Sequence, residues 1–164
     1  MLYNRRFLSD YLPRELIRAE RHGSSVALVM LDLDRFKQVN DTRGHAVGDA
    51  VLAQVAALLK RQIRGSDVAC RYGGEEFALV LPEATPEDAR HRGEEIRVAI
   101  GREQYEPSGV TASFGIALFP RDAFDADSLI RAADAALYEA KQSGRNQVRM
   151  AAGRSAEREP APFR

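Results

Sequence analysis

Two adjacent glutamates, Glu75 and Glu76, follow the pair Gly73-Gly74 between two apolar segments of the chain. Apolar segments separated by a glycine pair are typical of a β-hairpin, because glycine reaches the positive φ values that tight hairpin turns use. Carboxylates this close repel each other, and the repulsion raises their pKa values. A bound cation would relieve the repulsion. The tip of the predicted hairpin is therefore a candidate metal site, although solvated turn residues are the commoner explanation for such acids.

A second acidic cluster follows the apolar run from Val26 to Leu31, which is typical of a buried strand. Asp32 stands where this strand is expected to end, and Asp34 comes shortly after it. Carboxylates at the end of one strand and at the tip of a hairpin can meet if both elements belong to one sheet. Such oxygen ligands suit Mg²⁺, whereas no histidine or cysteine pair has zinc-site spacing. Asp32 taken alone would also suit a helix N-cap.

With these two clusters the chain resembles the GGDEF family of diguanylate cyclases, here with Gly-Gly-Glu-Glu-Phe as the signature. The resemblance extends from Leu2 to about Val148 and rests on several ordered motifs rather than on the signature alone. These motifs are Tyr3–Phe7, Asp32–Lys37, Asn40–His45, Gly48–Asp49, Arg71–Phe77, Ser113–Ala117 and Ala136–Asn146.

The resemblance implies that two molecules of GTP condense to cyclic di-GMP with release of two pyrophosphates. In each half-reaction a ribose 3′-hydroxyl attacks an α-phosphate. Asp32, the Leu33 backbone carbonyl and Glu75 match the family's ligands for Mg²⁺, for which Mn²⁺ is an alternative, and Glu76 is a further candidate ligand. Glu75 is also a candidate for helping to deprotonate the attacking hydroxyl, although a metal could do this without a protein base.

Asn40 and Asp49 match the family's guanine-recognising positions. A carboxylate accepts hydrogen bonds from guanine N1–H and the N2 amine, and an amide serves the other edge atoms. Read without the family, Asp49 is equally well explained as an acid that favours a helix N-terminus. Gly73 and Gly74 would let the backbone approach the substrate closely, or would only permit the turn.

Lys141 and Arg145 match the family's phosphate-contacting cations, and Lys37 is expected to join them. In isolation, Lys141 would be explained by its favourable place in the last turn of a helix. The phosphate role therefore rests on the resemblance.

A second, regulatory site is implied by Arg64 and Asp67, which form the family's Arg-x-x-Asp pattern for inhibitory product binding. Arginine suits the O6/N7 edge of guanine. Some members carry a supporting arginine at the position where this chain has Glu95. We therefore expect weaker product binding or another partner for the product.

Bulk composition is compatible with one ordinary domain in the 164 residues. Lysine plus arginine and aspartate plus glutamate number 24 each, which argues against binding to DNA or to an acidic membrane surface. The single cysteine, Cys70, is expected to be buried in a hairpin strand and fits a reducing compartment. No spanning segment or signal peptide is visible, so the chain is expected to be cytoplasmic, with membrane anchoring left to another part of a full-length protein.

The elements expected to position these residues alternate between helices and strands. Helices are predicted at 5–22, 47–63, 86–102 (capped by Thr85) and from a cap at Asp127 to 142, and strands at 26–31, within the hairpin 68–81, at 110–119 and at 147–150. The predicted fold class is α+β, and the family implies a mainly antiparallel central sheet surrounded by helices, as in nucleotide cyclases and polymerase palms. Residues 1–150 are predicted to form one GGDEF catalytic domain and residues 151–164 a disordered tail.

The chain starts just inside the family's usual opening turn, which predicts an upstream sensory or dimerising domain that has been removed. The leading hypothesis is a cyclase working as a homodimer, with one GTP on each subunit. The alternative is a non-catalytic GGDEF module that binds GTP or cyclic di-GMP as a signalling receptor. Another nucleotide cyclase or polymerase-like transferase is disfavoured by the specific motif set.

Overall fold

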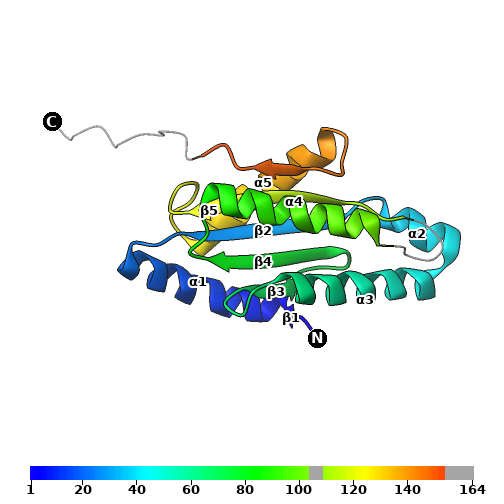
Figure 1. Cartoon of the computed structure of the whole chain (residues 1–164), viewed down its shortest axis with the longest axis horizontal. Coiled ribbons are helices and arrows are strands. Elements are labelled where there is room, and N and C mark those ends of the chain that lie inside the picture. The colour runs from blue at the N-terminus through cyan, green and yellow to red at the C-terminus, as the bar shows by residue number, and fades with distance from the viewer. Residues whose placement is uncertain (104–108, 154–164) are drawn as a thin grey trace.

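The computed structural model describes residues 1–103 and 109–153, and within them six strands form a single sheet (Figure 1). The order across the sheet is β1-β3-β4-β2-β5-β6. The inner neighbours β3, β4, β2 and β5 pair antiparallel, whereas the edge strands β1 and β6 pair parallel with their neighbours. The strands are β1 Tyr3–Asn4, β2 Val26–Leu33, β3 Val68–Arg71, β4 Glu76–Pro82, β5 Ala112–Phe119 and β6 Val148–Met150.

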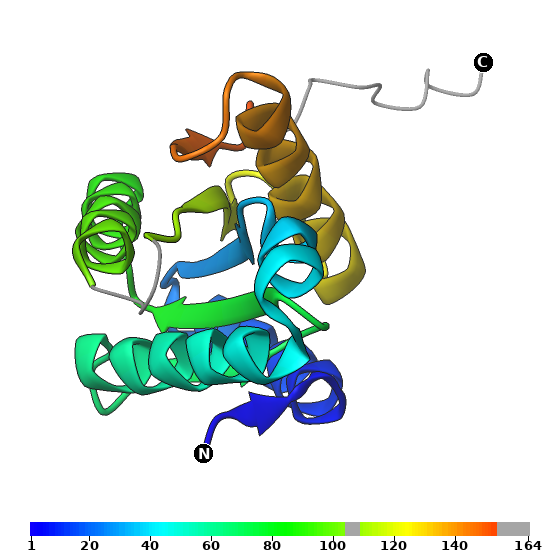
Figure 2. The same cartoon turned by 90° about the vertical axis from the view of Figure 1, so that its right-hand side faces the viewer.

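Helices cover both faces of this sheet (Figure 2). α3 and α4 share a core with one face, and α1 and α5 share a core with the other. The short α2 follows β2 directly and leads into α3. The helices are α1 Arg5–His22, α2 Phe36–Arg43, α3 His45–Gln62, α4 Pro86–Arg102 and α5 Ala126–Gln142.

β2 is the central strand, and all eight of its residues are buried. Successive side chains on a strand point to opposite faces of the sheet. Val29 and Leu31 accordingly enter the core beneath α3 and α4, and Leu28 and Met30 enter the core beneath α1 and α5. A carboxylate near the end of this strand is therefore held by a rigid scaffold.

α5 lies unusually close to β5, and Gly115 makes that approach possible. A Cβ atom added at Gly115 would overlap the Ala133 carbonyl oxygen and the Leu137 backbone nitrogen of α5. Because the obstacle is backbone, no side-chain rotation could relieve the overlap. The missing side chain at Gly115 thus sets the distance between the sheet and the helix that carries Lys141.

Most predicted elements are confirmed, with ends that differ by a residue or two. α4 has its predicted bounds, and its N-cap Thr85 forms a capping box with Asp88. The N-cap of α5, however, is Asp125 rather than Asp127. The Asp125 carboxylate accepts from the Ser128 backbone N–H at 2.7 Å, while the Ser128 hydroxyl accepts from the Asp125 N–H at 3.1 Å. Asp127 lies inside the first turn of α5, two residues after the N-cap, and is not part of the capping box.

Two further features differ from what the sequence suggested. β2 continues through Asp32 to Leu33, so Asp32 is a strand residue and caps no helix. α2 was not predicted, because its N-cap Arg35 is in the left-handed conformation with no side-chain cap bond, and Phe36 is its one buried residue. It therefore lacks both the start signal and the apolar stripe of a longer helix.

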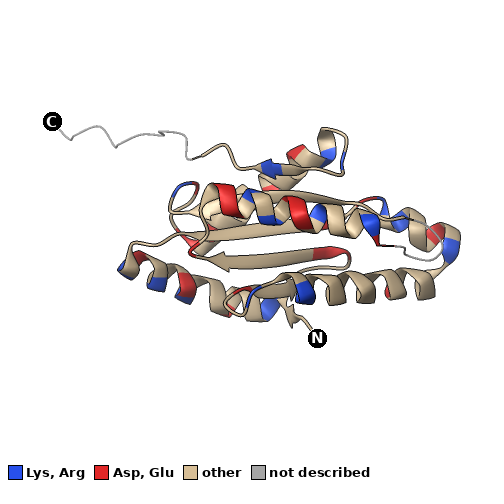
Figure 3. Cartoon of the chain, viewed as in Figure 1, with Lys and Arg blue, Asp and Glu red and all other residues tan. Residues whose placement is uncertain are grey.

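Charged residues lie mostly on the helices and at the ends of strands, and the start of β4 is acidic (Figure 3). Within residues 1–103 and 109–153, no helix combines the length and the apolar character that crossing a bilayer requires. Ala151 donates its backbone N–H to the Ile116 carbonyl at 2.7 Å and so continues the pairing of β6. Residues 154–164 of the predicted tail lie outside the described residues.

Candidate active site at the end of β2 and the β3–β4 turn

The two acidic clusters meet, because β2 and β4 are antiparallel neighbours. Asp32 stands opposite Glu76 in the register of the two strands. One residue further on, the Leu33 backbone N–H donates to the Glu75 carbonyl oxygen at 3.2 Å. Asp32 is buried and Glu76 is half-buried. The prediction that the end of one strand and the tip of a hairpin bring carboxylates together is consistent with this register.

Lys141 of α5 reaches the same point from the other side. Its Nζ lies 2.8 Å from the Asp32 Oδ2 and forms an ion pair with it. Burial raises the pKa of Asp32, and the hydrogen bond and charge of Lys141 partly offset this shift. Burial also raises the pKa of Glu76, and repulsion from Asp32 adds to the shift. The site therefore contains carboxylates whose charged form would be stabilised by a further cation.

The described residues contain no cluster of three histidine, cysteine, aspartate or glutamate side chains close enough to hold a metal ion by themselves. The Asp32 carboxylate is instead paired with the Lys141 ammonium group. The donor set still fits Mg²⁺, which commonly takes one or two carboxylates and completes its shell with water and substrate phosphates. Zinc is a poorer fit, because the residues brought together here are hard oxygen donors.

The turn between β3 and β4 differs from the tight glycine turn that was predicted. It spans residues 72–75, and neither Gly73 nor Gly74 has a positive φ. Gly73 instead packs closely against Glu76, since a Cβ there would lie 2.7 Å from the Glu76 Oε2 and would displace that carboxylate. Arg71 closes the turn by donating to the Gly73 and Gly74 carbonyls at 3.3 and 2.8 Å. Around Gly74 there is open space, which leaves its backbone approachable.

The predicted guanine-recognising residues lie on two consecutive helices. Asn40 is near the end of α2 and Asp49, which is exposed, is in α3. The Asn40 Oδ1 is buried and has no hydrogen-bond partner among the described residues. It lies where the side chain of residue 48 would otherwise be, so that a Cβ at Gly48 would overlap it. A buried amide oxygen without a partner is costly, so the Asn40 amide retains an unused hydrogen-bond acceptor.

Asp34 is a site residue to which sequence reasoning gave no role. Its carboxylate accepts from the Thr111 Oγ1 at 2.7 Å, from the Ser113 Oγ at 2.6 Å and from the Asn146 backbone N–H at 3.0 Å. Asp34 thereby joins the loop after β2 to β5 and to the α5–β6 connection. Its spacing from Asp32 gave no hint of these partners, since all of them lie far away in sequence.

The remaining predicted phosphate contacts are exposed. Lys37 lies on α2, and Arg145 lies in the connection between α5 and β6. Arg145 lines a cavity of about 400 Å³ together with Arg35 and Arg43 of the α2 region. Among the described residues none of these arginines forms an ion pair, and they outnumber Asp34, the one acid that lines the same cavity.

Arg64 and Asp67 are also brought together, between α3 and β3. The Asp67 Oδ2 accepts from the Arg64 backbone N–H at 2.8 Å and forms an ion pair with the Arg92 Nη2 at 3.3 Å. Arg92 belongs to α4 and lines the same cavity of about 330 Å³ as Arg64, Asp67 and Glu95. Arg92 is thus a second arginine of this cavity, about one helical turn before Glu95 in α4. It was not identified from the sequence.

Residues 1–147 match the family described as "Diguanylate cyclase, GGDEF domain". The response regulator PleD of Caulobacter vibrioides is 38% identical over 156 residues, which cover 90% of this chain and 34% of PleD. The diguanylate cyclase DosC of Escherichia coli is 38% identical over 154 residues, which cover 91% of this chain and 33% of DosC. The chain therefore spans about a third of the length of these curated relatives.

Solved structures of the same family share the fold. The active GGEEF domain of a diguanylate cyclase from Vibrio cholerae matches with a TM-score of 0.87 and 32% identity, covering 95% of this chain and 100% of that one. The coiled coil and GGDEF domain of DgcB from Caulobacter crescentus, in complex with c-di-GMP, matches with a TM-score of 0.85 and 36% identity, covering 92% and 82%. The α+β prediction is confirmed, and the chain belongs to the GGDEF family of diguanylate cyclases.

Proposed function

We propose that this chain is a catalytically competent diguanylate cyclase domain, which condenses two GTP molecules to cyclic di-GMP and releases two pyrophosphates. The observation that carries the proposal is the meeting of Asp32 with Glu76 and Lys141 at one end of the sheet. Phosphoryl-type transfer depends mainly on positioning and on neutralising charge, and this end of the molecule has both carboxylates and cations.

The acidic residues would hold the metal. Asp32, the Leu33 carbonyl and Glu75 are the proposed ligands of Mg²⁺ or Mn²⁺, with Glu76 as an additional one. When bound, such an ion supplies charge neutralisation for the phosphates. Glu75 is placed next to the β2 end by the hydrogen bond from the Leu33 backbone, and it is our candidate for accepting the proton of the attacking 3′-hydroxyl.

The substrate would lie across the α2 region. The buried, unpartnered Asn40 amide oxygen and the Asp49 carboxylate are proposed to bind the guanine edge. Lys37 and Arg145 would bind the triphosphate, and Lys141 would exchange its contact with Asp32 for one with a phosphate. In the reaction the 3′-oxygen bonds to the α-phosphorus, the bond from that phosphorus to the pyrophosphate oxygen breaks, and the hydroxyl proton leaves to a base.

The proposed working form is a homodimer. One site holds one GTP, and the product joins two guanylyl units, so two sites must face each other. An upstream dimerising domain would bring them together, and a solved structure of DgcB contains a coiled coil beside its GGDEF domain. Product would inhibit by binding at Arg64 and Asp67, and Arg92, which lines the same cavity, would supply a second guanidinium there.

The experiment is incubation of concentrated protein with GTP and Mg²⁺, with products separated by chromatography. We expect cyclic di-GMP from the parent and none from Glu75→Gln. If the parent is silent, the same assay is run on a chain fused to a dimeric coiled coil. Continued silence of the fused protein would favour the alternative, a non-catalytic module that binds GTP or cyclic di-GMP as a receptor.

A further inference from the structure

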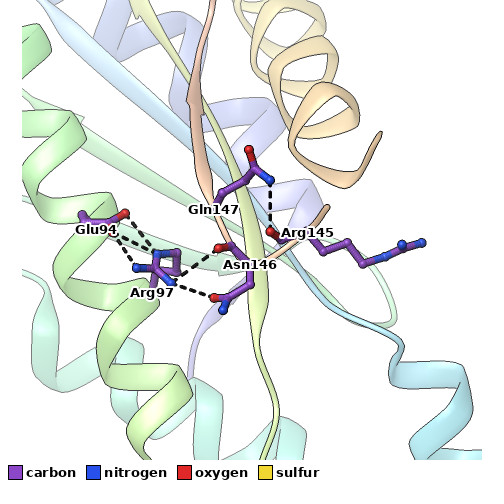
Figure 4. A network of polar contacts seen from close by, with 5 residues as sticks. All are labelled: Glu94, Arg97, Arg145, Asn146 and Gln147. Atoms are coloured by element: carbon purple, nitrogen blue, oxygen red, sulfur yellow. Dashed lines mark hydrogen bonds and ion pairs between the residues drawn. The ribbon is translucent and has the colours of Figure 1, made fainter. Parts of the chain in front are cut away.

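Arg97 of α4 reaches across to the connection between α5 and β6 (Figure 4). Its Nη1 donates to the Asn146 side-chain oxygen at 2.8 Å and to the Asn146 carbonyl oxygen at 3.5 Å. Its Nε and Nη2 donate to the Glu94 carboxylate, the latter at 2.6 Å. Glu94 therefore fixes the plane of the guanidinium group, and the remaining nitrogen is committed to Asn146.

The connection that Arg97 holds has an unusual backbone. Gly144, Arg145 and Asn146 have φ values of 112°, 63° and 45°, so three consecutive residues are in the left-handed half of the map. Side-chain-bearing residues adopt such values rarely, and they persist only where surrounding contacts impose them. Arg97 supplies one of those contacts, from a helix on the opposite face of the sheet to α5.

Further contacts fix the same segment from the active-site side. The Asn146 backbone N–H donates to the Asp34 carboxylate at 3.0 Å, and the Arg145 N–H donates to the Ala140 carbonyl at 3.0 Å. The Gln147 amide donates to the Arg145 carbonyl at 3.1 Å. With its backbone held in this way, the Arg145 side chain points away from Arg97 and Asn146 (Figure 4).

We propose that Arg97 is a positioning residue for Arg145: by binding Asn146 it fixes the backbone from which the Arg145 guanidinium reaches the triphosphate of the substrate. The proposal rests on the proposed function for the identity of that anion. Arg97 itself points its guanidinium at Glu94 and Asn146 and would not touch the substrate. A purely structural role, in which Arg97 only ties α4 to the loop, would leave anion binding unchanged.

The test is a double-mutant cycle on equilibrium binding to the full 164-residue chain. The probes are 3′-deoxy-GTP with Mg²⁺, which lacks the attacking hydroxyl and cannot react, and guanosine, which lacks phosphates. We expect Arg97→Ala to weaken 3′-deoxy-GTP binding by about 5- to 10-fold and to leave guanosine binding within about 2-fold. Arg145→Ala should do the same, and adding Arg97→Ala to Arg145→Ala should cost little more.

Matched variants separate positioning from folding. Arg102→Ala removes an arginine from the last turn of the same helix and should leave both affinities unchanged. Arg97→Lys keeps the charge but not the planar fork, so it should restore little. If Arg97→Ala fails to fold in a thermal unfolding assay, Asn146→Gly removes the side-chain acceptor, which has the shorter of the two contacts with Arg97, while still allowing the positive φ. It should reproduce the loss for 3′-deoxy-GTP.

Fully multiplicative losses in the cycle, an equal loss for guanosine, or unchanged affinity for 3′-deoxy-GTP in Arg97→Ala would each overturn the positioning role. These outcomes leave the proposed function standing, provided that the parent binds 3′-deoxy-GTP and Arg145→Ala weakens it. A parent that bound no 3′-deoxy-GTP would overturn both, because Arg145 would then have no triphosphate to hold.

Discussion

At Gly48 the missing side chain makes room for the Asn40 amide, and substitution of this glycine tests the proposed guanine site. A methyl group from Gly48→Ala would overlap the Asn40 Oδ1 and displace it. We expect KM for GTP to rise by about 10-fold or more, because a hydrogen bond to the base would be lost. Steady-state kinetics of a dimerised chain measures this change.

The matched control for that substitution is Gly101→Ala in α4, where an added Cβ meets no atom of the described residues within 4 Å. It should leave KM unchanged and stabilise the helix slightly. An unchanged KM in Gly48→Ala would instead mean that the Asn40 amide does not take part in binding.

Cys70 shows how burial controls reactivity at a single residue. It is fully buried in β3, and burial raises the pKa of its thiol to about 11. The thiol therefore stays protonated near neutral pH, while the thiol of an unfolded chain ionises at a lower pH. We expect alkylation by iodoacetamide at about pH 8 to be about 100-fold slower in the folded protein than in denaturant. Similar rates in both states would contradict the burial, and Cys70→Ala supplies the blank.

At the scale of elements, the spacing between α5 and β5 decides where Lys141 lies. Gly115→Ala would force the helix away from the sheet, because the obstacles are backbone atoms. We expect a loss of about 2 kcal/mol or more in the free energy of unfolding, measured by urea denaturation. The displaced helix should also weaken the Lys141–Asp32 ion pair, so activity should fall even at temperatures where the variant is folded. Stability equal to that of Gly101→Ala would refute the close approach.

How far the sequence specifies these elements depends on how local their signals are. α4 was predicted to its ends, since Thr85, Pro86 and Asp88 are start signals within one turn. The cap of α5 was misplaced, because Asp125 and Asp127 are both acids near the helix start, and only the partnership with Ser128 separates them. α2 has no comparable signal. Local chemistry fixes helix ends well where it is unambiguous.

The candidate site, too, could be predicted only where its contacts follow from simple sequence patterns. The meeting of the two acidic clusters could be anticipated, since it requires only that a strand and a hairpin share a sheet. The pairing of Lys141 with Asp32, the three partners of Asp34 and the contact of Arg92 with Asp67 could not. The contacts of Lys141 and Arg92 depend on how helices pack against the sheet, and those of Asp34 with Thr111 and Ser113 depend on the pairing of β2 with β5. Neither arrangement can be read from the local sequence.

For the whole molecule, the surface offers little general attraction to polyanions. The formal net charge is zero, and the cations that matter are concentrated near the α2 region and the α5–β6 connection. Two copies of the chain carry the same net charge, which is zero, so net charge neither attracts nor repels them. A dimer of half-sites would have to be favoured by an attached dimerising segment or by the substrate itself.

The last prediction follows from that picture of the dimer. If each chain holds one GTP, product forms only when two loaded chains meet, so specific activity should rise in proportion to protein concentration while most chains are monomeric. Fusion to a parallel coiled coil replaces this encounter by a high effective concentration and should raise activity by about 100-fold at low concentration. The measurement is initial rate against protein concentration for both forms, with Glu75→Gln in the fused form as the inactive control. A specific activity that stayed constant on dilution of the unfused chain would show that one chain completes the reaction alone, and the half-site arrangement would have to be abandoned.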